Sequence, residues 1–148
     1  MVQLRPAIKA DAPGIRALVH QAQINPLDLD WPRFVVAVNQ DGELVGCGQV
    51  KTHRDGSREL ASIVVASEFR NQGVARAIIE HLTAQYPGTL YLTCRPSLGA
   101  FYEKFGYQII QAGEMPVYFR RVSHLFRLMS KTGILGDEGL LVMRRDGA

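Results

Sequence analysis

The sequence predicts a mixed α/β domain, and three patterns support this fold class. Residues 60–65 form an apolar run, rich in β-branched side chains, with the length of a buried strand. After a short loop, apolar residues recur at helical spacing: Val74, Ala75, Ile78, Ile79 and Leu82. Asp41-Gly42 separates two other strand-like runs, which is a hairpin signal. Because helices separate the later strands, the pattern indicates a mixed α/β domain.

The first half of the chain contains four predicted strands and two helices. The strands are residues 2–8, 34–39, 44–52 and a run that ends at Val65. Asp11 offers an N-cap to a helix that ends near Gln21. Residues 25–32 carry two prolines and two aspartates and are predicted to be a loop. A second turn at residues 54–57 leads into the fourth strand, and the second helix follows it.

In the second half, Pro87-Gly88 interrupts the chain before a strand over residues 89–94. A short helix is predicted over residues 97–105, ended by Gly106 as a left-handed cap. Two further strands are predicted, residues 107–111 and 139–144. The connection between them contains apolar residues at helical spacing, which predict one more helix: Val122, Leu125, Phe126 and Met129.

Composition predicts a single domain, residues 1–148, with a sizeable core, since 47% of the residues are hydrophobic. No apolar stretch has the length of a membrane span, and the N-terminus lacks the regions of a signal peptide. Cys47 and Cys94 stand alone in strand-like runs, so we expect buried, reduced thiols and a cytoplasmic protein. The histidines have no metal-ligand spacing, and no metal is expected: His20, His53, His81 and His124.

The net charge of +3 is unevenly spread, with basic residues concentrated in residues 115–148. Such a segment could meet nucleic acid, an acidic partner or a phosphate, or it could be a solvated helix face. No alternation of aromatic and basic residues is present, so nucleic acid is disfavoured as a partner.

The loop between residue 65 and the second helix has the features of an anion site. Gly73 introduces the helix, whose first N–H groups have no intrahelical partner and lie at the positive end of the helix dipole. Arg70 and Arg76 add positive charge, and small Ala75 permits close approach. An ordinary tight turn between strand and helix is the alternative. Neither a Walker motif nor a dinucleotide fingerprint is present.

The stretch Arg70-Asn71-Gln72-Gly73-Val74-Ala75 resembles the acetyl-CoA signature Gln/Arg-x-x-Gly-x-Gly/Ala of the GCN5-related N-acetyltransferase (GNAT) family. The order of elements is similar to that family from about residue 2 to residue 144. The resemblance implies a mostly antiparallel sheet of six to seven strands, splayed at the central strands, with about four flanking helices. It also implies that the loop and Arg76 hold the pyrophosphate of coenzyme A. The backbone of Ile63, Val64 and Val65 would bind the pantetheine arm, with the oxyanion donor near Val65.

The implied reaction is transfer of an acetyl group from acetyl-CoA to a primary amine, by direct attack in a ternary complex. Tyr102 lies in a segment similar to the family's Phe-Tyr-x-x-x-Gly-Phe/Tyr and is the candidate proton donor to the thiolate. Its alternative is a core tyrosine. Glu59, eleven residues before Arg70, is the candidate base. Its alternative is a surface glutamate paired with Arg58 or Lys51.

The chain departs from the family pattern before the tyrosine. Arg95 and Leu98 occupy the positions of the usual Asn-x-x-Ala, and Ser67 replaces a common proline. A covalent route through Cys94 is a second possible mechanism, although no histidine is placed in sequence to activate it. A non-catalytic acyl-CoA-binding regulatory domain is the alternative function.

The acceptor is predicted only as a small-molecule amine or a protein amine. In the family the acceptor groove is lined by two loops, which here correspond to the loop after the first helix and to residues 114–136. The first carries an acidic and aromatic set that could hold an ammonium group, or could be a solvated loop with a core tryptophan: Asn25, Asp28, Asp30 and Trp31. The second carries basic residues that could select an acidic acceptor. The expected assembly is a monomer or a homodimer.

Overall fold

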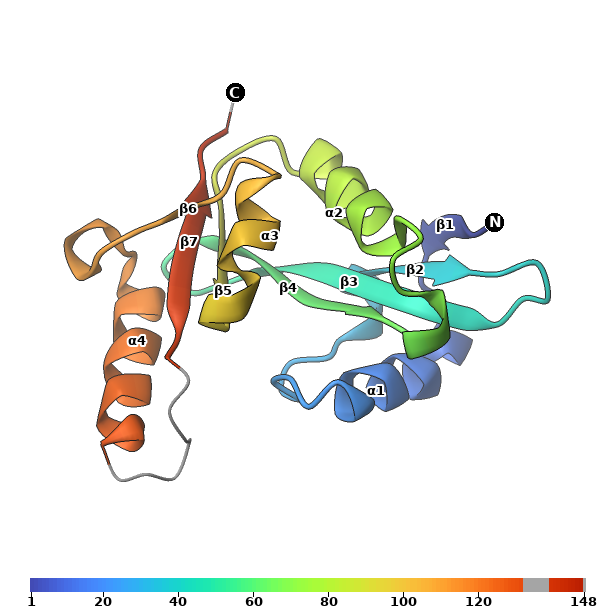
Figure 1. Ribbon diagram of the computed structural model, residues 1–148, viewed down its shortest axis with the longest axis horizontal. Coiled ribbons are helices and arrows are strands. Elements are labelled where there is room, and N and C mark those ends of the chain that lie inside the picture. Colours follow the sequence, from blue (N-terminus) through green and yellow to red (C-terminus); the bar gives the residue numbers. More distant parts are fainter. Residues whose placement is uncertain (132–138, 148) are drawn as a thin grey trace. The chain divides into compact units, whose positions relative to one another are not determined.

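The computed structural model describes residues 1–131 and 139–147. Its strands form one seven-stranded sheet in the order β1-β2-β3-β4-β5-β7-β6 (Figure 1). The strands are β1 (Gln3–Pro6), β2 (Phe34–Val38), β3 (Leu44–Thr52), β4 (Arg58–Val65), β5 (Leu90–Cys94), β6 (Gln108–Ile109) and β7 (Leu141–Arg145). The α-helices are α1 (Ala12–Gln21), α2 (Val74–Gln85), α3 (Gly99–Glu103) and α4 (Val117–Ser130).

The sheet is mostly antiparallel, which confirms the predicted fold class. Antiparallel pairing joins β1 to β2, β2 to β3, β5 to β7 and β6 to β7. Parallel pairing joins β4 to β5, with Glu59 opposite Tyr91. Among the described residues this is the one register pair between the two strands, as the implied central splay requires.

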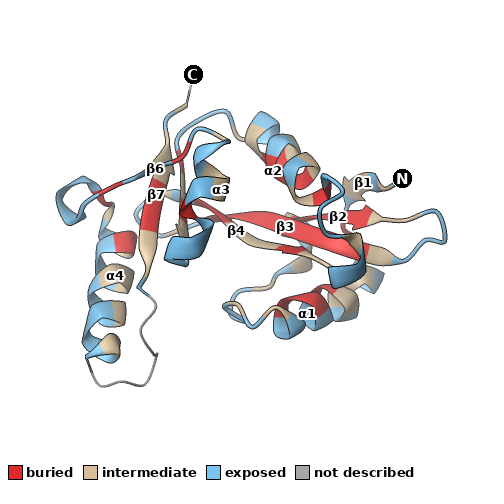
Figure 2. Cartoon of the chain, in the orientation of Figure 1, coloured by how far each residue is buried: buried red, intermediate tan, exposed pale blue. Residues whose placement is uncertain are grey.

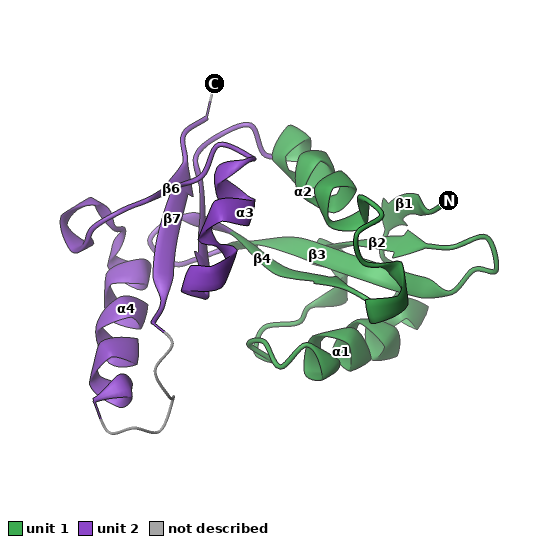
Figure 3. Cartoon of the chain, in the orientation of Figure 1, with its two compact units in different colours: residues 1–51, 60–85 green, residues 52–59, 86–148 purple. Residues whose placement is uncertain are grey.

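The chain divides into two compact units (Figure 3). Unit 1 comprises residues 1–51 and 60–85, and unit 2 comprises residues 52–59 and 86–148. Strand β4 contributes to both units, since Glu59 belongs to unit 2 and Leu60 to unit 1. That the whole chain is a single domain stays a prediction.

In unit 1, helices α1 and α2 cover opposite faces of the sheet (Figure 1). Cys47 of β3 packs in a core with Ile15 and Val19 of α1, and the buried residues of both helices face the strands (Figure 2). The next residue, Gly48, faces α2. A Cβ there would lie 2.7 Å from Cγ2 of Ile78, so only glycine allows α2 to pack this closely. Successive residues of β3 thus face opposite sides of the sheet, one toward α1 and the next toward α2.

In unit 2, α4 packs through Phe119. This side chain is fully buried and forms a core cluster with Ile110, Met115 and Val142. Helix α4 confirms the helix that the sequence predicted. The apolar residues that predicted it are only partly the residues that α4 buries. Val122 and Phe126 are half-buried, whereas Leu125 and Met129 are exposed. The packed face is centred on Phe119, which the sequence pattern did not include.

Three local predictions need correction. Asp11 does precede α1, but its side chain bonds the Arg5 guanidinium at 2.7 Å and the Ile8 amide instead of capping α1. The predicted strand over residues 107–111 has only two residues in β6. The predicted helix over residues 97–105 begins as a 3₁₀ turn (η4, Pro96–Leu98), and Gly106 ends it at a φ of +91°, as predicted.

The remaining short segments are 3₁₀ turns: η1 (Lys9–Asp11), η2 (Trp31–Arg33), η3 (Ser67–Phe69) and η5 (Ala112–Glu114). Cys47 and Cys94 are free and buried, as predicted. In the described part of the chain, no helix is long and apolar enough to traverse a bilayer. The same residues contain no group of three or more His, Cys, Asp or Glu side chains arranged as metal ligands.

Candidate active site

The predicted phosphate loop in unit 1 leads directly into α2. Asn71 and Gly73 have positive φ values, 63° and 82°, so the backbone turns sharply twice before the helix begins. The first helical hydrogen bond runs from the Ala77 amide to the Gly73 carbonyl at 3.0 Å. The amides of Val74 and Ala75 precede that bond and therefore have no acceptor within the helix. Together with the helix dipole, they favour an anion at this end of α2.

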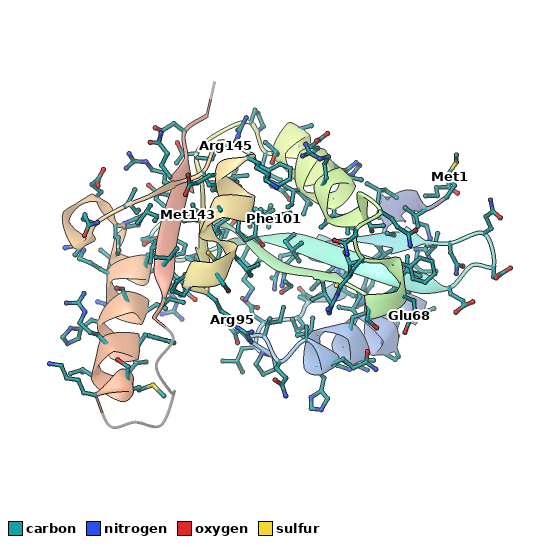
Figure 4. All side chains as sticks on the ribbon, viewed as in Figure 1. Met1, Glu68, Arg95, Phe101, Met143 and Arg145 are labelled. Atoms are coloured by element: carbon teal, nitrogen blue, oxygen red, sulfur yellow. The ribbon has the colours of Figure 1, made fainter. Side chains whose placement is uncertain are left out.

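Side chains of the loop fix its shape from within. Arg70 Nε donates to the Val65 carbonyl at 3.3 Å, and Gln72 Nε2 donates to the Glu68 carbonyl at 3.3 Å. Glu68 lies in the turn η3 immediately ahead of the loop (Figure 4). Residues 70–73 are exposed, and no described atom lies within 4 Å of the position a Cβ would take on Gly73. The backbone of the loop is therefore open to a phosphate group, which fits the pyrophosphate of coenzyme A.

Strand β4 is distorted just before the residues predicted to bind the pantetheine arm. Ser62 has a φ of +59°, which is uncommon for a residue other than glycine and interrupts the regular strand. The fully buried Gln49 supports this position, because its Nε2 donates to Ser62 Oγ at 2.9 Å. Cys47 Sγ also donates to the Ser62 carbonyl at 3.5 Å. Residues 63–65 thus lie between a buttressed distortion and the phosphate loop.

In the acidic loop of unit 1, residues 25–32, the aspartates pair with an arginine that the sequence analysis did not include. Arg33 pairs with Asp28 at 2.8 Å and with Asp30 at 3.7 Å, and its Nε donates to Gln49 Oε1 at 3.1 Å. Trp31 packs against the core of unit 1. The loop therefore matches the alternative interpretation, in which its charges are satisfied internally and its tryptophan anchors the core. A signal was present in the sequence, since Arg33 follows Asp30 by three residues.

Glu59, the candidate base, is buried in unit 2 and is 7% exposed. Its Oε1 lies 2.8 Å from Nε2 of His53. The two residues considered as its surface partners have other contacts: Arg58 lies over the ring of Tyr86, and Lys51 Nζ donates to the Leu27 carbonyl within unit 1. A buried carboxylate next to an imidazole has the composition of a general-base pair.

His53 is the residue of this site that the sequence analysis missed. The spacing of the histidines bears only on metal binding, whereas the turn at residues 54–57, which His53 and Glu59 flank, bears on their pairing. The His53 amide donates to the Ser57 carbonyl at 2.9 Å, which closes that turn. A hairpin turn brings residues on either side of it together, and this was the available signal.

Tyr102 lies in α3 of unit 2 with its ring against Phe101, at 5.1 Å between centroids, and Tyr107, at 6.1 Å. Burial, with a smaller contribution from Cys94, raises the pKa of Tyr102 to about 12. The phenol therefore keeps its proton at neutral pH, as a proton donor must.

Cys94, at the end of β5, is a poor candidate for a covalent mechanism. Burial raises the pKa of its thiol to about 11, so the nucleophilic thiolate is scarce at neutral pH. Its Sγ contacts Met143 Sδ at 3.8 Å, which is a packing contact. Arg95 follows where β5 leads into η4 and α3 (Figure 4).

Comparison with known proteins identifies the family. Residues 30–109, more than half of the chain, match the model described as "Acetyltransferase (GNAT) domain". The chain belongs to the GNAT acetyltransferase family, as its sequence motifs predicted. A search of curated proteins found no match.

Three solved structures illustrate the shared fold. Rv2747 from Mycobacterium tuberculosis, in complex with CoA, has a TM-score of 0.77 at 19% identity, with 99% of each chain covered. The ribosomal-protein-S18-alanine N-acetyltransferase from Escherichia coli has a TM-score of 0.71 at 19% identity, covering 100% of this chain and 95% of the other. N-acetylglutamate synthase from Neisseria gonorrhoeae, complexed with coenzyme A and N-acetyl-glutamate, has a TM-score of 0.76 at 18% identity. The chain is covered completely in that match but spans only 35% of the synthase chain.

Proposed function

We propose that this protein is an N-acetyltransferase that moves an acetyl group from acetyl-CoA to a primary amine by direct attack in a ternary complex. The observation that carries the proposal is the loop from Arg70 to Gly73, whose exposed backbone leads into the N-terminus of α2 within the region that matches the GNAT family. We propose that residues 1–148 act as one catalytic domain, without a metal.

In this proposal the cosubstrate is held mainly by backbone groups. The amides of residues 71–75 bind the pyrophosphate, and Arg70 and Arg76 supply positive charge beside it. The backbone of Ile63, Val64 and Val65 hydrogen-bonds the amides of the pantetheine arm, as an added strand would. An amide near Val65 stabilises the oxyanion of the tetrahedral intermediate.

Two side chains move protons. Glu59 takes a proton from the acceptor ammonium, because only the free amine has the lone pair that attacks the thioester carbon. Tyr102 donates its proton to the departing thiolate of coenzyme A, and its pKa of about 12 keeps that proton available at neutral pH. The acceptor is a small-molecule amine or a protein amine.

The experiment that tests the proposal is thiol release from acetyl-CoA in the presence of pooled amines. The pools are amino acids, polyamines, aminoglycosides and short peptides, and each is scored against the hydrolysis measured without amine. Release with one pool supports the transferase and gives its acceptor class. No release with any pool, from folded protein that binds coenzyme A, would favour a non-catalytic acyl-CoA-binding domain.

A further inference from the structure

His53 and Glu59 form a buried pair in unit 2. The side chains of both residues are 10% exposed, and Nε2 of His53 lies 2.8 Å from Oε1 of Glu59. A carboxylate that is nearly cut off from water has few routes by which a proton can leave it. The imidazole has a second ring nitrogen and can accept a proton at one nitrogen while releasing another from the other.

Aromatic side chains of α4 hold the imidazole ring in place. Tyr118 stacks on His53 with ring centroids 3.5 Å apart and an interplanar angle of 12°, and the edge of Phe119 approaches at 5.6 Å. Stacking fixes the plane of the imidazole and so the direction in which Nε2 points toward Glu59. Rotation of the ring away from the carboxylate would break both contacts.

A hydrogen bond joins the turn next to His53, residues 54–57, to helix α4. Asp55 Oδ2 accepts a hydrogen bond from the Tyr118 amide at 2.9 Å, which caps the N-terminus of α4 from a distant part of the chain. Interaction with His53 is the smallest of the influences that lower the pKa of Asp55. In the part of the chain that the structure describes, the titratable groups around the imidazole are Glu59 from β4, Asp55 from the turn and the phenol of Tyr118 from α4.

We propose that His53 is the positioning and proton-relay residue of the base Glu59. The inference rests on the proposed acetyl transfer. Glu59 removes one proton from the acceptor ammonium, the proton passes from the carboxyl to Nε2 of His53, and the imidazole releases a proton to water from Nδ1. The nitrogen loses a second proton when the amide forms. This proton replaces the one that Tyr102 gives to the coenzyme A thiolate, so Tyr102 ends the reaction protonated. One ammonium and acetyl-CoA thus yield the amide, the free thiol and one proton in solution.

The test compares the pH dependence of thiol release for the wild type, His53→Gln and the matched control His20→Gln. His20 is an exposed histidine of α1 that belongs to neither predicted acceptor segment. Glutamine can still hydrogen-bond Glu59 but cannot carry the proton. We expect kcat of His53→Gln to fall about 10²-fold, with an unchanged KM for acetyl-CoA. The variant should also lose whatever dependence of kcat on pH the imidazole confers on the wild type, whereas a merely structural role would leave the shape of the pH profile unchanged.

A second pair of measurements keeps the test decisive if His53→Gln folds poorly. His53→Ala removes the ring, and added imidazole should restore part of the lost turnover in a concentration-dependent way. Glu59→Gln should lower kcat by a similar factor, and the double variant with His53→Gln should be no slower, because the two residues act as one unit.

The outcomes separate the relay from the transferase. Thiol release by the wild type with an unchanged rate and pH profile in His53→Gln would overturn the relay and leave the transferase standing. Full turnover in Glu59→Gln would do the same. Absence of thiol release from the wild type with every amine pool would overturn the proposed function and the relay together.

Discussion

The phosphate loop of unit 1 and the His53–Glu59 pair of unit 2 are built in opposite ways. The loop is one continuous segment, and its proposed binding groups are backbone amides whose direction is set by two positive φ values. The pair depends on the turn after β3, the start of β4 and the first turn of α4, which lie far apart in the sequence. A backbone site can therefore be recognised from a short motif, whereas a side-chain site requires the tertiary packing to be known.

The largest expected effect tests unit 2. Tyr102→Phe should lower kcat for acetyl transfer by about 10²- to 10⁴-fold, because the thiolate loses its proton donor. Coenzyme A affinity, measured by calorimetry, should stay unchanged. Tyr86→Phe is the control, since this ring lies under Arg58 and has no role in the proposed chemistry. Equal turnover in Tyr102→Phe and the wild type would contradict the catalytic role of Tyr102, whereas coenzyme A binding with no thiol release from either protein would favour a non-catalytic acyl-CoA-binding domain.

The next effect concerns the packing that supports the loop in unit 1. Gly48→Ala places a Cβ 2.6 Å from Cδ1 of Ile63 and 2.7 Å from Cγ2 of Ile78. Overpacking of this kind costs about 1–3 kcal/mol in the free energy of unfolding, measured by urea denaturation. Gly88→Ala serves as the control, because its Cβ would meet no described atom within 4 Å. Equal stability of the two variants would show that α2 can move away from β3 at little cost.

A matched pair of glycines sharpens the claim that unit 1 binds phosphate through its backbone. Gly73 and Gly42 have φ values of 82° and 79°, and neither has a described neighbour within 4 Å of an added Cβ. Alanine at either position should cost about 1–2 kcal/mol of stability, because its Cβ disfavours the left-handed backbone. Only Gly73→Ala should also weaken coenzyme A binding, by about tenfold, or about 1.4 kcal/mol. Equal affinity of both variants, measured by calorimetry, would argue against a phosphate site at the loop.

The smallest effect tests how unit 2 holds its histidine. Asp55→Ala removes the cap of α4 and should lower the free energy of unfolding by about 1 kcal/mol at pH 7. Hydrogen bonds, first from the Ser57 side chain and then from the Tyr118 amide, lower the pKa of Asp55 to about 2. Since a carboxyl ordinarily titrates near pH 3.9, the contribution is present above about pH 4 and is lost as the pH falls toward 2.

Urea denaturation across this pH range checks the prediction. The difference between wild type and Asp55→Ala should shrink as the pH falls from 4 to 2. Asp41→Ala, in the hairpin turn of unit 1, should show little difference at either pH. A pH-independent difference for Asp55→Ala would mean that the carboxylate does not stabilise α4 through these bonds.

Most elements of the fold could be predicted because their patterns are local. Strand β3 has the predicted bounds, and α2 follows the apolar spacing of Val74, Ile78 and Leu82. Gly106 ends its helix with the predicted left-handed backbone. Asp11 was assigned to the wrong partner, because a nearby Arg5 offers its carboxylate a stronger charge-assisted bond than the helix amides do.

Part of the candidate site could be predicted because its patterns, too, are local in the sequence. The sequence by itself predicted the family, which the match to the GNAT model confirms, and it supplied the candidate phosphate loop and the candidate base, which stay predictions, since all three follow from residue types at fixed spacings. Only the tertiary structure decided that Glu59 is buried against His53, that Arg33 holds the aspartates of the acidic loop, and that α4 packs through Phe119. A side chain takes whichever partner the packing of distant elements brings within hydrogen-bond distance, and the spacing of residues along a single element does not contain that information.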